Sequence, residues 1–431
     1  MKAIFFVRNL AFCCILLLRY SPVSAAQEPQ GSESHGAQQP VALRDRIAEA
    51  ERSNPQIAAA EYRYHAATHI AAEKSALPDA QLTVQQFSVG SPRPFAGYTN
   101  SEFAYIGIGV SQEIPYPGKR GLRAHVGNRE ADVRRADVES LRHDVIDKIK
   151  ATYFQLAYLQ QTLAILERSN DLLNDVQQIA DSRYRVGQGN QQEVLKAQLQ
   201  HARILQEITM HHSEVGQLEA QLKQLLNRRQ DSGDIQTEPL SARPLTYSAA
   251  DLLKVVRDQN PAVQSRQAML NKSQAEVDVA KKEFRPDFNL QYMYENTDRK
   301  FRDYYAVTLG INLPNRSRRK AELAEAEANR EQASKQLDAE LQQRLAEVQQ
   351  QYVTAQTSAE QLKIYGDGLV PQSEATFRSA VAAYQANRQD FQTLLSSFLD
   401  VLNLQLDYQR ELAEHESALA HLETLTGVNF Q

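Results

Sequence analysis

Tryptophan is absent from the 431-residue chain, which also has only four methionines and two cysteines. Both cysteines, Cys13 and Cys14, lie near the start of the chain. The rest of the chain therefore has no disulfide, no reactive thiol and no cysteine metal ligand. Four methionines are also too few to form a methionine-rich relay for soft cations.

The chain also has no large excess of charge of one sign. It has 48 Lys and Arg residues and 53 Asp and Glu residues, which give a net charge of -5. The two signs are interspersed, and without a basic stripe nucleic acid is not an expected partner. The chain has no glycine-rich phosphate loop, nucleophile elbow or paired-cysteine metal motif. We therefore expect no enzyme, no cofactor and no catalytic residue.

Glycine and proline are sparse, with 17 and 15 residues, whereas Ala, Gln, Glu, Leu and Arg fill long tracts. This mixture is typical of long helices. The mean hydropathy of -0.52 fits helices with wide polar faces. We therefore expect long helices in place of the two or three ordinary domains that the length alone would predict.

Residues 1–26 have the layout of a secretory signal peptide, with a positively charged start, an apolar run at 10–18 and small residues at 23–26. The apolar run is far shorter than the roughly 20 residues that a membrane-spanning helix needs. Residues 27–40 are polar and rich in Gly, Ser and Gln. They are predicted to form a disordered leader.

The remaining chain contains an internal duplication, in which residues 41–226 are repeated by residues 250–431. Three motif pairs carry it: Asn54-Pro55 and Asn260-Pro261 are 206 residues apart, Pro78-Asp79 and Pro286-Asp287 are 208 apart, and Pro115 and Pro314 are 199 apart. Because the order of the motifs also recurs, the sequence predicts two copies of one structural unit. For the connector, residues 227–249, two interpretations stay open: a plain linker, or a segment packed on the outside of the helices.

Each copy is predicted to contain a long helical hairpin. Residues 128–186 include neither Gly nor Pro over 59 positions, which as one helix would extend roughly 90 Å at 1.5 Å per residue. Apolar residues recur there with an average spacing of 3.5, typical of a coiled coil: Val138, Leu141, Val145, Ile149, Tyr153, Leu156, Leu159, Leu163 and Leu166. A break at 186–190 and a second helix to 226 complete the hairpin, whereas the second copy has an interruption at 366–371 and its tip at 384–388.

Each copy also contains two predicted strands, at about 80–90 and 103–114 and at about 287–296 and 304–313. Apolar residues alternate in them with polar or small ones. We predict that the following apolar side chains face lipid: Ile106, Ile108, Tyr305, Val307, Leu309 and Ile311.

Two soluble hairpins packed on helices would show the same alternation. The predicted export, the very long helices that follow, and the tyrosines and phenylalanines near the strand ends favour membrane strands instead. Four strands cannot close a pore alone, because the smallest single-chain barrels have about eight. Several copies of the chain must therefore contribute.

With these features the sequence resembles the TolC family of outer-membrane efflux factors, and within it the CusC/CzcC-like branch that serves cation-exporting pumps. The resemblance covers residues 41–427 and rests on the order of individually weak motifs: the two "NP" pairs, "QEIPYPGKR", "YRVGQGNQQEVLKAQ", "LVPQSEATFRSAVAAYQANRQDF" and "LETLTG". It implies a mainly helical fold with transmembrane β-strands, in which a homotrimer forms a twelve-stranded β-barrel continuous with a periplasmic α-helical tunnel. It also implies the outer membrane of a Gram-negative bacterium, docking to a periplasmic adaptor (membrane fusion protein), and an inner-membrane efflux pump.

The resemblance places the adaptor-docking tips at the two hairpin turns, with Tyr184, Gly187, Gly189, Tyr384 and Asn387. Gly187 and Gly189 suit a left-handed backbone, and Asn387 is the next best residue for it. Whether the two tyrosines pack the hairpin or present a docking surface stays open.

The resemblance also places a periplasmic entrance at Glu193, Asp390, Thr393 and Ser396. Thr393 and Ser396 stand where the founding member of the family has acidic residues. An acidic entrance would therefore survive in this chain only in altered form, through Glu193 and Asp390.

Histidines four apart, His65 and His69, and the adjacent His211 and His212 invite a metal interpretation, but no neighbouring carboxylate motif completes a catalytic site. Exposed or packing histidines are the expected alternative. Two other functions stay open. A duct for type I protein secretion would share the architecture, and a periplasmic coiled-coil adaptor would leave the amphipathic strands unexplained. The cargo, whether metal cations or small toxic compounds, is not revealed by the sequence.

Overall fold

A computed structural model describes residues 42–88, 104–296, 303–428 and 430. The predicted signal peptide (1–26) and leader (27–40) lie outside the described residues, as do parts of the predicted strands at 80–90 and 103–114. Among the described helices, none combines the length and apolar character needed to cross a membrane.

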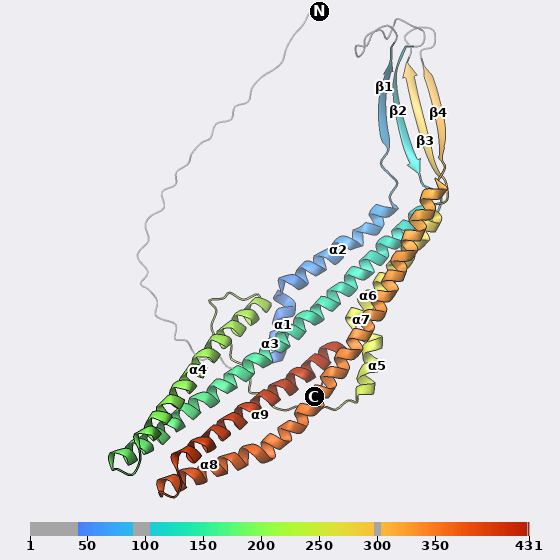
Figure 1. Cartoon of the computed structure of the whole chain (residues 1–431). Helices are drawn as coiled ribbons and strands as arrows, with labels where there is room; N and C mark the ends of the chain where they lie inside the picture. The colour runs from blue at the N-terminus through green and yellow to red at the C-terminus, as the bar shows by residue number, and fades with distance from the viewer. Residues whose placement is uncertain (1–41, 89–103, 297–302, 429, 431) are drawn as a thin grey trace, which may run out of the picture. The chain divides into compact units, whose positions relative to one another are not determined.

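The two copies place their helices and strands in the same order (Figure 1). The first copy consists of α1 (Leu43–Ser53), α2 (Pro55–Ser75), β1 (Gln81–Phe87), β2 (Tyr105–Ile114), α3 (Lys119–Arg185) and α4 (Gln191–Leu225). The second consists of α5 (Ala249–Gln259), α6 (Pro261–Lys282), β3 (Asp287–Asn296), β4 (Tyr304–Asn312), α7 (Arg316–Ile364), the π turn η1 (Tyr365–Leu369), α8 (Val370–Gln385) and α9 (Phe391–Thr426). The expected mainly helical fold with four strands is confirmed.

The repeated Asn-Pro motif joins the ends of each copy. Asn54 caps α2 by accepting hydrogen bonds from the amides of residues 56 and 57, and its side-chain amide donates to the Leu225 carbonyl at 2.9 Å. Asn260 caps α6 in the same way and donates to the Leu425 carbonyl at 2.9 Å. A proline at the first helical position needs no amide partner. In each copy the motif therefore joins the end of the helical hairpin, at Leu225 or Leu425, to the start of α2 or α6.

All four strands form one antiparallel sheet in the order β1-β2-β3-β4 (Figure 1). In the first hairpin Leu82 lies opposite Val110, and in the second Leu290 lies opposite Leu309. Leu82 of β1 and Leu290 of β3 are 208 residues apart, and Val110 of β2 and Leu309 of β4 are 199 residues apart. The two hairpins therefore have the same register.

The long helix α3 organises the helical part, packing against α2, α4, α6 and α9. Of the nine apolar residues with 3.5-residue spacing, eight are buried and Leu141 is half-buried. The predicted coiled-coil seam is therefore the packed face of α3. Helices α3 and α4 form the first antiparallel hairpin, and α8 and α9 form the second (Figure 1).

The interruption predicted at 366–371 is a π turn, and the chain stays helical from α7 through η1 into α8. The Val370 amide donates to the Tyr365 carbonyl, five residues back. Pro371 has no amide hydrogen and its ring would clash with a carbonyl in a regular α-helix. Matching positions are 199 residues apart at Pro115 and Pro314 but 200 apart at the tips. Between these two points the second copy is therefore one residue longer than the first, and the wider π turn accommodates the extra residue.

The connector between α4 and α5 has no helix or strand but packs on the helices. Ile235 is buried against α3 and α4. The Gln160 side chain of α3 donates to the Ile235 carbonyl at 2.8 Å and accepts from the Thr237 hydroxyl at 2.7 Å. Of the two interpretations left open, the structure therefore has the packed segment.

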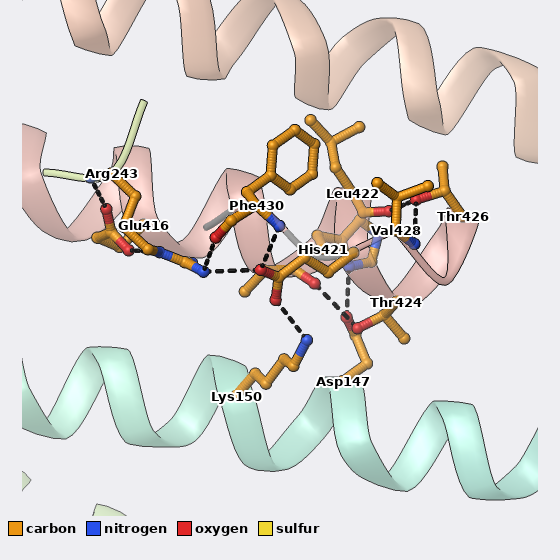
Figure 2. Close-up of polar contacts among 12 residues, drawn as sticks. Asp147, Lys150, Arg243, Glu416, His421, Leu422, Thr424, Thr426, Val428 and Phe430 are labelled. Atoms are coloured by element: carbon orange, nitrogen blue, oxygen red, sulfur yellow. Dashed lines mark hydrogen bonds and ion pairs between the residues drawn. The ribbon is translucent and has the colours of Figure 1, made fainter. Parts of the chain in front are cut away.

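A charged cluster around α9 fixes the connector to the second copy through Arg243 and joins the two copies through α3 (Figure 2). The Arg243 guanidinium contacts Glu416 at 2.6 Å and Glu423 at 2.7 Å, both on α9. Glu423 also contacts Lys150 of α3 at 2.7 Å. Close by, His421 of α9 contacts Asp147 of α3 at 2.7 Å (Figure 2). Hydrogen bonding to Asp147 raises the pKa of His421, although burial opposes this.

Candidate functional site

The two hairpin turns have the same backbone geometry. Gly187 has a φ of 73° and its amide donates to the Tyr184 carbonyl, while the next amide donates to residue 183. Asn387 has a φ of 58°, and its amide donates to the Tyr384 carbonyl in the same arrangement. This pair of bonds is the Schellman motif, which needs a left-handed residue after the helix. Asn387 thus takes the conformation that Gly187 takes in the first copy.

Gly189 does not share this conformation, because its φ lies outside the left-handed region. The expectation that it uses left-handed freedom is therefore wrong. A Cβ atom at Gly189 would lie 3.2 Å from a carboxylate oxygen of Glu193 and 3.3 Å from the Tyr184 amide nitrogen. The residue is small because the turn packs closely against the end of α3 and the start of α4.

The two tip tyrosines have different environments. Tyr384 is 1% exposed, its ring contacts Phe391, and its hydroxyl donates to Glu193 at 2.7 Å. Burial and this hydrogen bond raise the pKa of Tyr384 strongly, so the hydroxyl remains a donor. Tyr184 is 44% exposed. Tyr384 therefore packs the tip, whereas Tyr184 is accessible on its surface.

Arg183 connects the two tips, a role that the sequence analysis missed. Its guanidinium donates to the Tyr384 carbonyl and to the Asn387 side chain, and lies 4.3 Å from the centre of the Tyr384 ring. Lys196 of α4 adds a contact of 2.8 Å to Gln392 of α9. The two turns therefore form one packed unit. The matching residue in the second copy is Ala383. Arginine at one tip and alanine at the other was the feature of the sequence that could have indicated this role of Arg183.

The sheet has one mainly apolar and one mainly polar face, since directly opposed residues in antiparallel strands share a face. Exceptions include Gln86 and Gln112 on the apolar face and Phe87 and Tyr105 on the polar face. The apolar face contains Leu82, Val84, Ile106, Ile108, Val110, Leu290, Tyr292, Tyr294, Tyr305, Val307, Leu309 and Ile311. The opposite face contains Thr83, Gln85, Gly107, Gly109, Ser111, Asn289, Gln291, Met293, Glu295, Ala306, Thr308 and Gly310. All six side chains predicted to face lipid lie on the apolar face.

A charged cluster joins the sheet to the helices. Lys119, at the start of α3, is 1% exposed and contacts both Glu283 and Asp287 at 2.9 Å. Asp287 also accepts a hydrogen bond from the Tyr116 amide at 2.7 Å. Gly118, just before α3, has a φ of 92°, which an L side chain rarely adopts. These contacts hold the β2-to-α3 turn of the first copy against the start of β3 in the second copy.

The model of the outer membrane efflux protein family matches residues 47–228 and 252–425, which lie in the two copies. The chain belongs to the outer membrane efflux protein family. Membership confirms the predicted family and the location in the outer membrane of a Gram-negative bacterium, extending into the periplasm.

One named relative is similar in sequence over most of the chain. The cobalt-zinc-cadmium resistance protein CzcC of Cupriavidus metallidurans is 20% identical over 317 residues, which cover 73% of this chain and 75% of CzcC.

Solved structures share the fold. The outer-membrane channel OprN matches with a TM-score of 0.77 and 16% identity over 90% of each chain. VceC of Vibrio cholerae matches with a TM-score of 0.74 and 17% identity over 90% of this chain and 97% of VceC. CusC matches with a TM-score of 0.76 and 14% identity over 90% of this chain and 92% of CusC.

Within the family fold, the four predicted entrance residues lie close to the tips. Glu193 faces Tyr384 within the chain. Asp390 caps α9 by accepting from the Thr393 amide at 2.8 Å and from its hydroxyl at 3.0 Å. The bond from this amide lowers the pKa of Asp390. Thr393 and Ser396 are exposed on α9. Asp390 is therefore ionised at neutral pH, and Glu193 is engaged in tip packing.

The four histidines considered as metal ligands lie on two helices. His65 and His69 are exposed on α2, and His211 of α4 contacts Glu214 of the same helix at 2.8 Å. Over residues 42–88, 104–296 and 303–428, no group of three or more His, Cys, Asp or Glu side chains is arranged to hold a metal ion.

Proposed function

We propose that this chain is one protomer of a homotrimeric outer-membrane duct. Four strands from each protomer close a twelve-stranded β-barrel, and the helical hairpins continue it as a tunnel into the periplasm. The observation that carries this proposal is the four-stranded sheet, which has a continuous apolar face and is joined directly to a helix of 67 residues. In a bilayer such a sheet is stable only if its edges are closed by further strands.

The duct is passive and has no catalytic function. It acts in a tripartite export system, in which an inner-membrane pump supplies the energy and a periplasmic adaptor joins the pump to the duct. The tips are the adaptor-docking surface. Support comes from the packed unit that Arg183 and Tyr384 form and from the exposed side chains Tyr184 and Val186 beside it.

Divalent metal cations are the proposed cargo. The likeness to the cobalt-zinc-cadmium resistance protein CzcC supports this choice over small organic compounds. The ionised Asp390 near the predicted entrance is also compatible with cations. Protein secretion through a type I system is the alternative with the same architecture.

The test is a deletion strain complemented with the chain or with an empty vector. After a pulse of zinc, cobalt or cadmium, the metal content of the cells is measured by mass spectrometry. We expect the complemented strain to retain several-fold less of at least one metal. Equal metal content, together with lower retention of an organic dye or with a protein that reaches the medium only in the complemented strain, would contradict the cation cargo.

A further inference from the structure

Basic residues gather at the end of the sheet where the long helices begin. α2 and α6 end there, and α3 and α7 start there (Figure 1). The four segments that enter or leave the strands at this end, 73–80, 113–123, 281–287 and 313–322, contain 11 Lys and Arg residues and 6 Asp and Glu residues. Their net charge of +5 contrasts with -5 for the whole chain. In the proposed duct, on which this inference rests, that end of the sheet meets the periplasmic leaflet of the outer membrane.

Part of this positive charge is neutralised inside the chain by three carboxylates, Glu283, Asp287 and Glu322. Their partners are Lys119, Arg123, Arg318 and Arg319. Six further cations form no ion pair with any residue that the structure describes, and we call them the basic collar: Lys74, Arg120, Lys282, Arg285, Arg316 and Lys320. Five of them are exposed and Lys282 is half-buried. They extend from the base of β1 to the base of β4.

The stability of the helices does not explain the whole collar. Lys74 and Lys282 lie in the last turns of α2 and α6, where the helix dipole favours a cation. Arg120 and Arg316 lie at the starts of α3 and α7, where the dipole disfavours a cation. Neither α3 nor α7 has an acidic residue in its first turn. Positive charge is therefore present at this level of the molecule even where it destabilises a helix.

The collar lies at the level where lipid headgroups begin. β3 has 10 residues and β4 has 9, and tilted strands of about 9–11 residues span the hydrocarbon core of a bilayer. The apolar face ends on β2 at Ile114, and Tyr116 follows two residues later. Lys282 Nζ lies 5.4 Å and Arg285 Cζ lies 6.0 Å from the centre of the Tyr116 ring. Because tyrosine is enriched at membrane interfaces, this arrangement places both cations at the border of the apolar face.

We propose that the basic collar binds the phosphate groups of anionic phospholipids, such as phosphatidylglycerol, in the periplasmic leaflet. The planar guanidinium of Arg285 can donate to two phosphate oxygens, and Lys282 adds a compact positive charge beside it. A zwitterionic headgroup carries its own cation next to the phosphate, so it gains less from the collar. The collar therefore selects anionic over zwitterionic lipids.

Native mass spectrometry of the full-length protein, purified in mild detergent, tests this selection. The protein is mixed with phosphatidylglycerol or with phosphatidylcholine, and the bound lipids are counted. The test variant combines Lys282→Gln, Arg285→Gln and Arg316→Gln. If this variant does not fold, Arg120→Gln with Lys320→Gln tests the rest of the collar.

The matched control combines Lys254→Gln, Arg257→Gln and Lys363→Gln. It also removes three charges, from exposed positions on α5 and near the far end of α7. Each Lys or Arg near an anionic surface adds about fivefold to lipid affinity, so the wild type should retain phosphatidylglycerol at least about fivefold more than phosphatidylcholine. The collar variant should lose most of this preference, and the control should keep it.

Equal retention of both lipids by the wild type, or an unchanged preference in the collar variants, would overturn the proposal. Complete displacement of the lipid by inorganic phosphate would indicate a site for free phosphate and would overturn it as well. The same spectra give the number of chains. Absence of the preference in a complex of three chains would overturn the collar alone, whereas a protein of one chain would overturn the proposed duct.

Discussion

Tyr184 and Tyr384 stand 200 residues apart, at the same step before the same kind of turn, but one is 44% exposed and the other 1%. Their backbones make equivalent Schellman bonds. The difference in exposure comes from a contact between the two copies, because the Arg183 guanidinium of the first tip lies over the Tyr384 ring of the second tip. Duplication thus preserves turns and caps, whereas contacts between the copies decide which side chain is buried.

The charged residues next to the sheet also differ in burial between the two copies. Lys119 is buried against Asp287 inside the chain, while its counterpart Arg318 is exposed at the open edge. The first copy meets the second within one chain, whereas in the proposed trimer the second copy would meet the first copy of another chain. Substitutions at matched positions can therefore separate what stabilises the chain from what assembles the trimer.

The largest expected effect is at Lys119. Lys119→Met leaves Asp287 without its lysine partner, whereas Glu283 keeps its contact with Arg123 at 2.7 Å. Removing one partner of a buried ion pair costs about 3–5 kcal/mol. Arg318→Met removes an exposed charge and should cost the single chain about 0–1 kcal/mol. Thermal unfolding of the purified proteins and the yield in the outer membrane measure the two effects. Equal loss of folded chain in both variants would contradict the assignment of Lys119, and not Arg318, as the residue that stabilises the single chain.

The next largest effect separates the two faces of the sheet. Leu309→Arg places a charge on the apolar face, at a cost of about 2–4 kcal/mol if the residue lies at the bilayer midplane. Thr308→Arg, one position away, points to the polar face and should be tolerated. The measurement is the amount of assembled protein in outer-membrane fractions. Similar assembly of both variants would mean that the face assignment is wrong.

A smaller effect is expected at the tips. Gly187→Val and Asn387→Val each force a β-branched residue into the left-handed region, with a strain of about 1–3 kcal/mol. Assembly should persist, while adaptor cross-linking and efflux fall. The matched control is Gly216→Val, because Gly216 lies within α4 and a Cβ atom added there meets no atom within 4 Å. Full efflux from both tip variants would exclude the tips from the docking step.

The smallest effect concerns pH. The pKa of His421 is raised by its bond to Asp147 and by the charge of Glu347, against burial and Arg344. The protonated form is therefore favoured in the folded chain, and its stabilisation is present below about pH 6.5 and lost as pH rises through the folded pKa. His421→Gln reproduces the residue of the first copy, Gln221. The wild type should exceed this variant in unfolding free energy by about 1 kcal/mol or less at acidic pH, and the difference should shrink at alkaline pH. A difference independent of pH would contradict this assignment.

Local features of the fold could be predicted from the sequence because their signals are local. The Asn-Pro caps, the heptad spacing of α3, the strand alternation and the left-handed Asn387 follow from neighbouring residues. Tyr384 burial, the Arg183 contacts and the packing of Gly189 depend on segments that meet only in the folded chain. An interruption was predicted at 366–371 from Gly366, Gly368 and Pro371, but its form, a π turn inside a continuous helix, could not be predicted from these residues.

The most direct test of the proposed duct is the mass of the protein purified from outer membranes in mild detergent. Light scattering with the contribution of bound detergent subtracted gives the number of chains in the complex. The proposed closure of four-stranded sheets predicts the mass of three copies. A protein with the mass of one copy, and with the same mass after reconstitution into lipid nanodiscs, would contradict it.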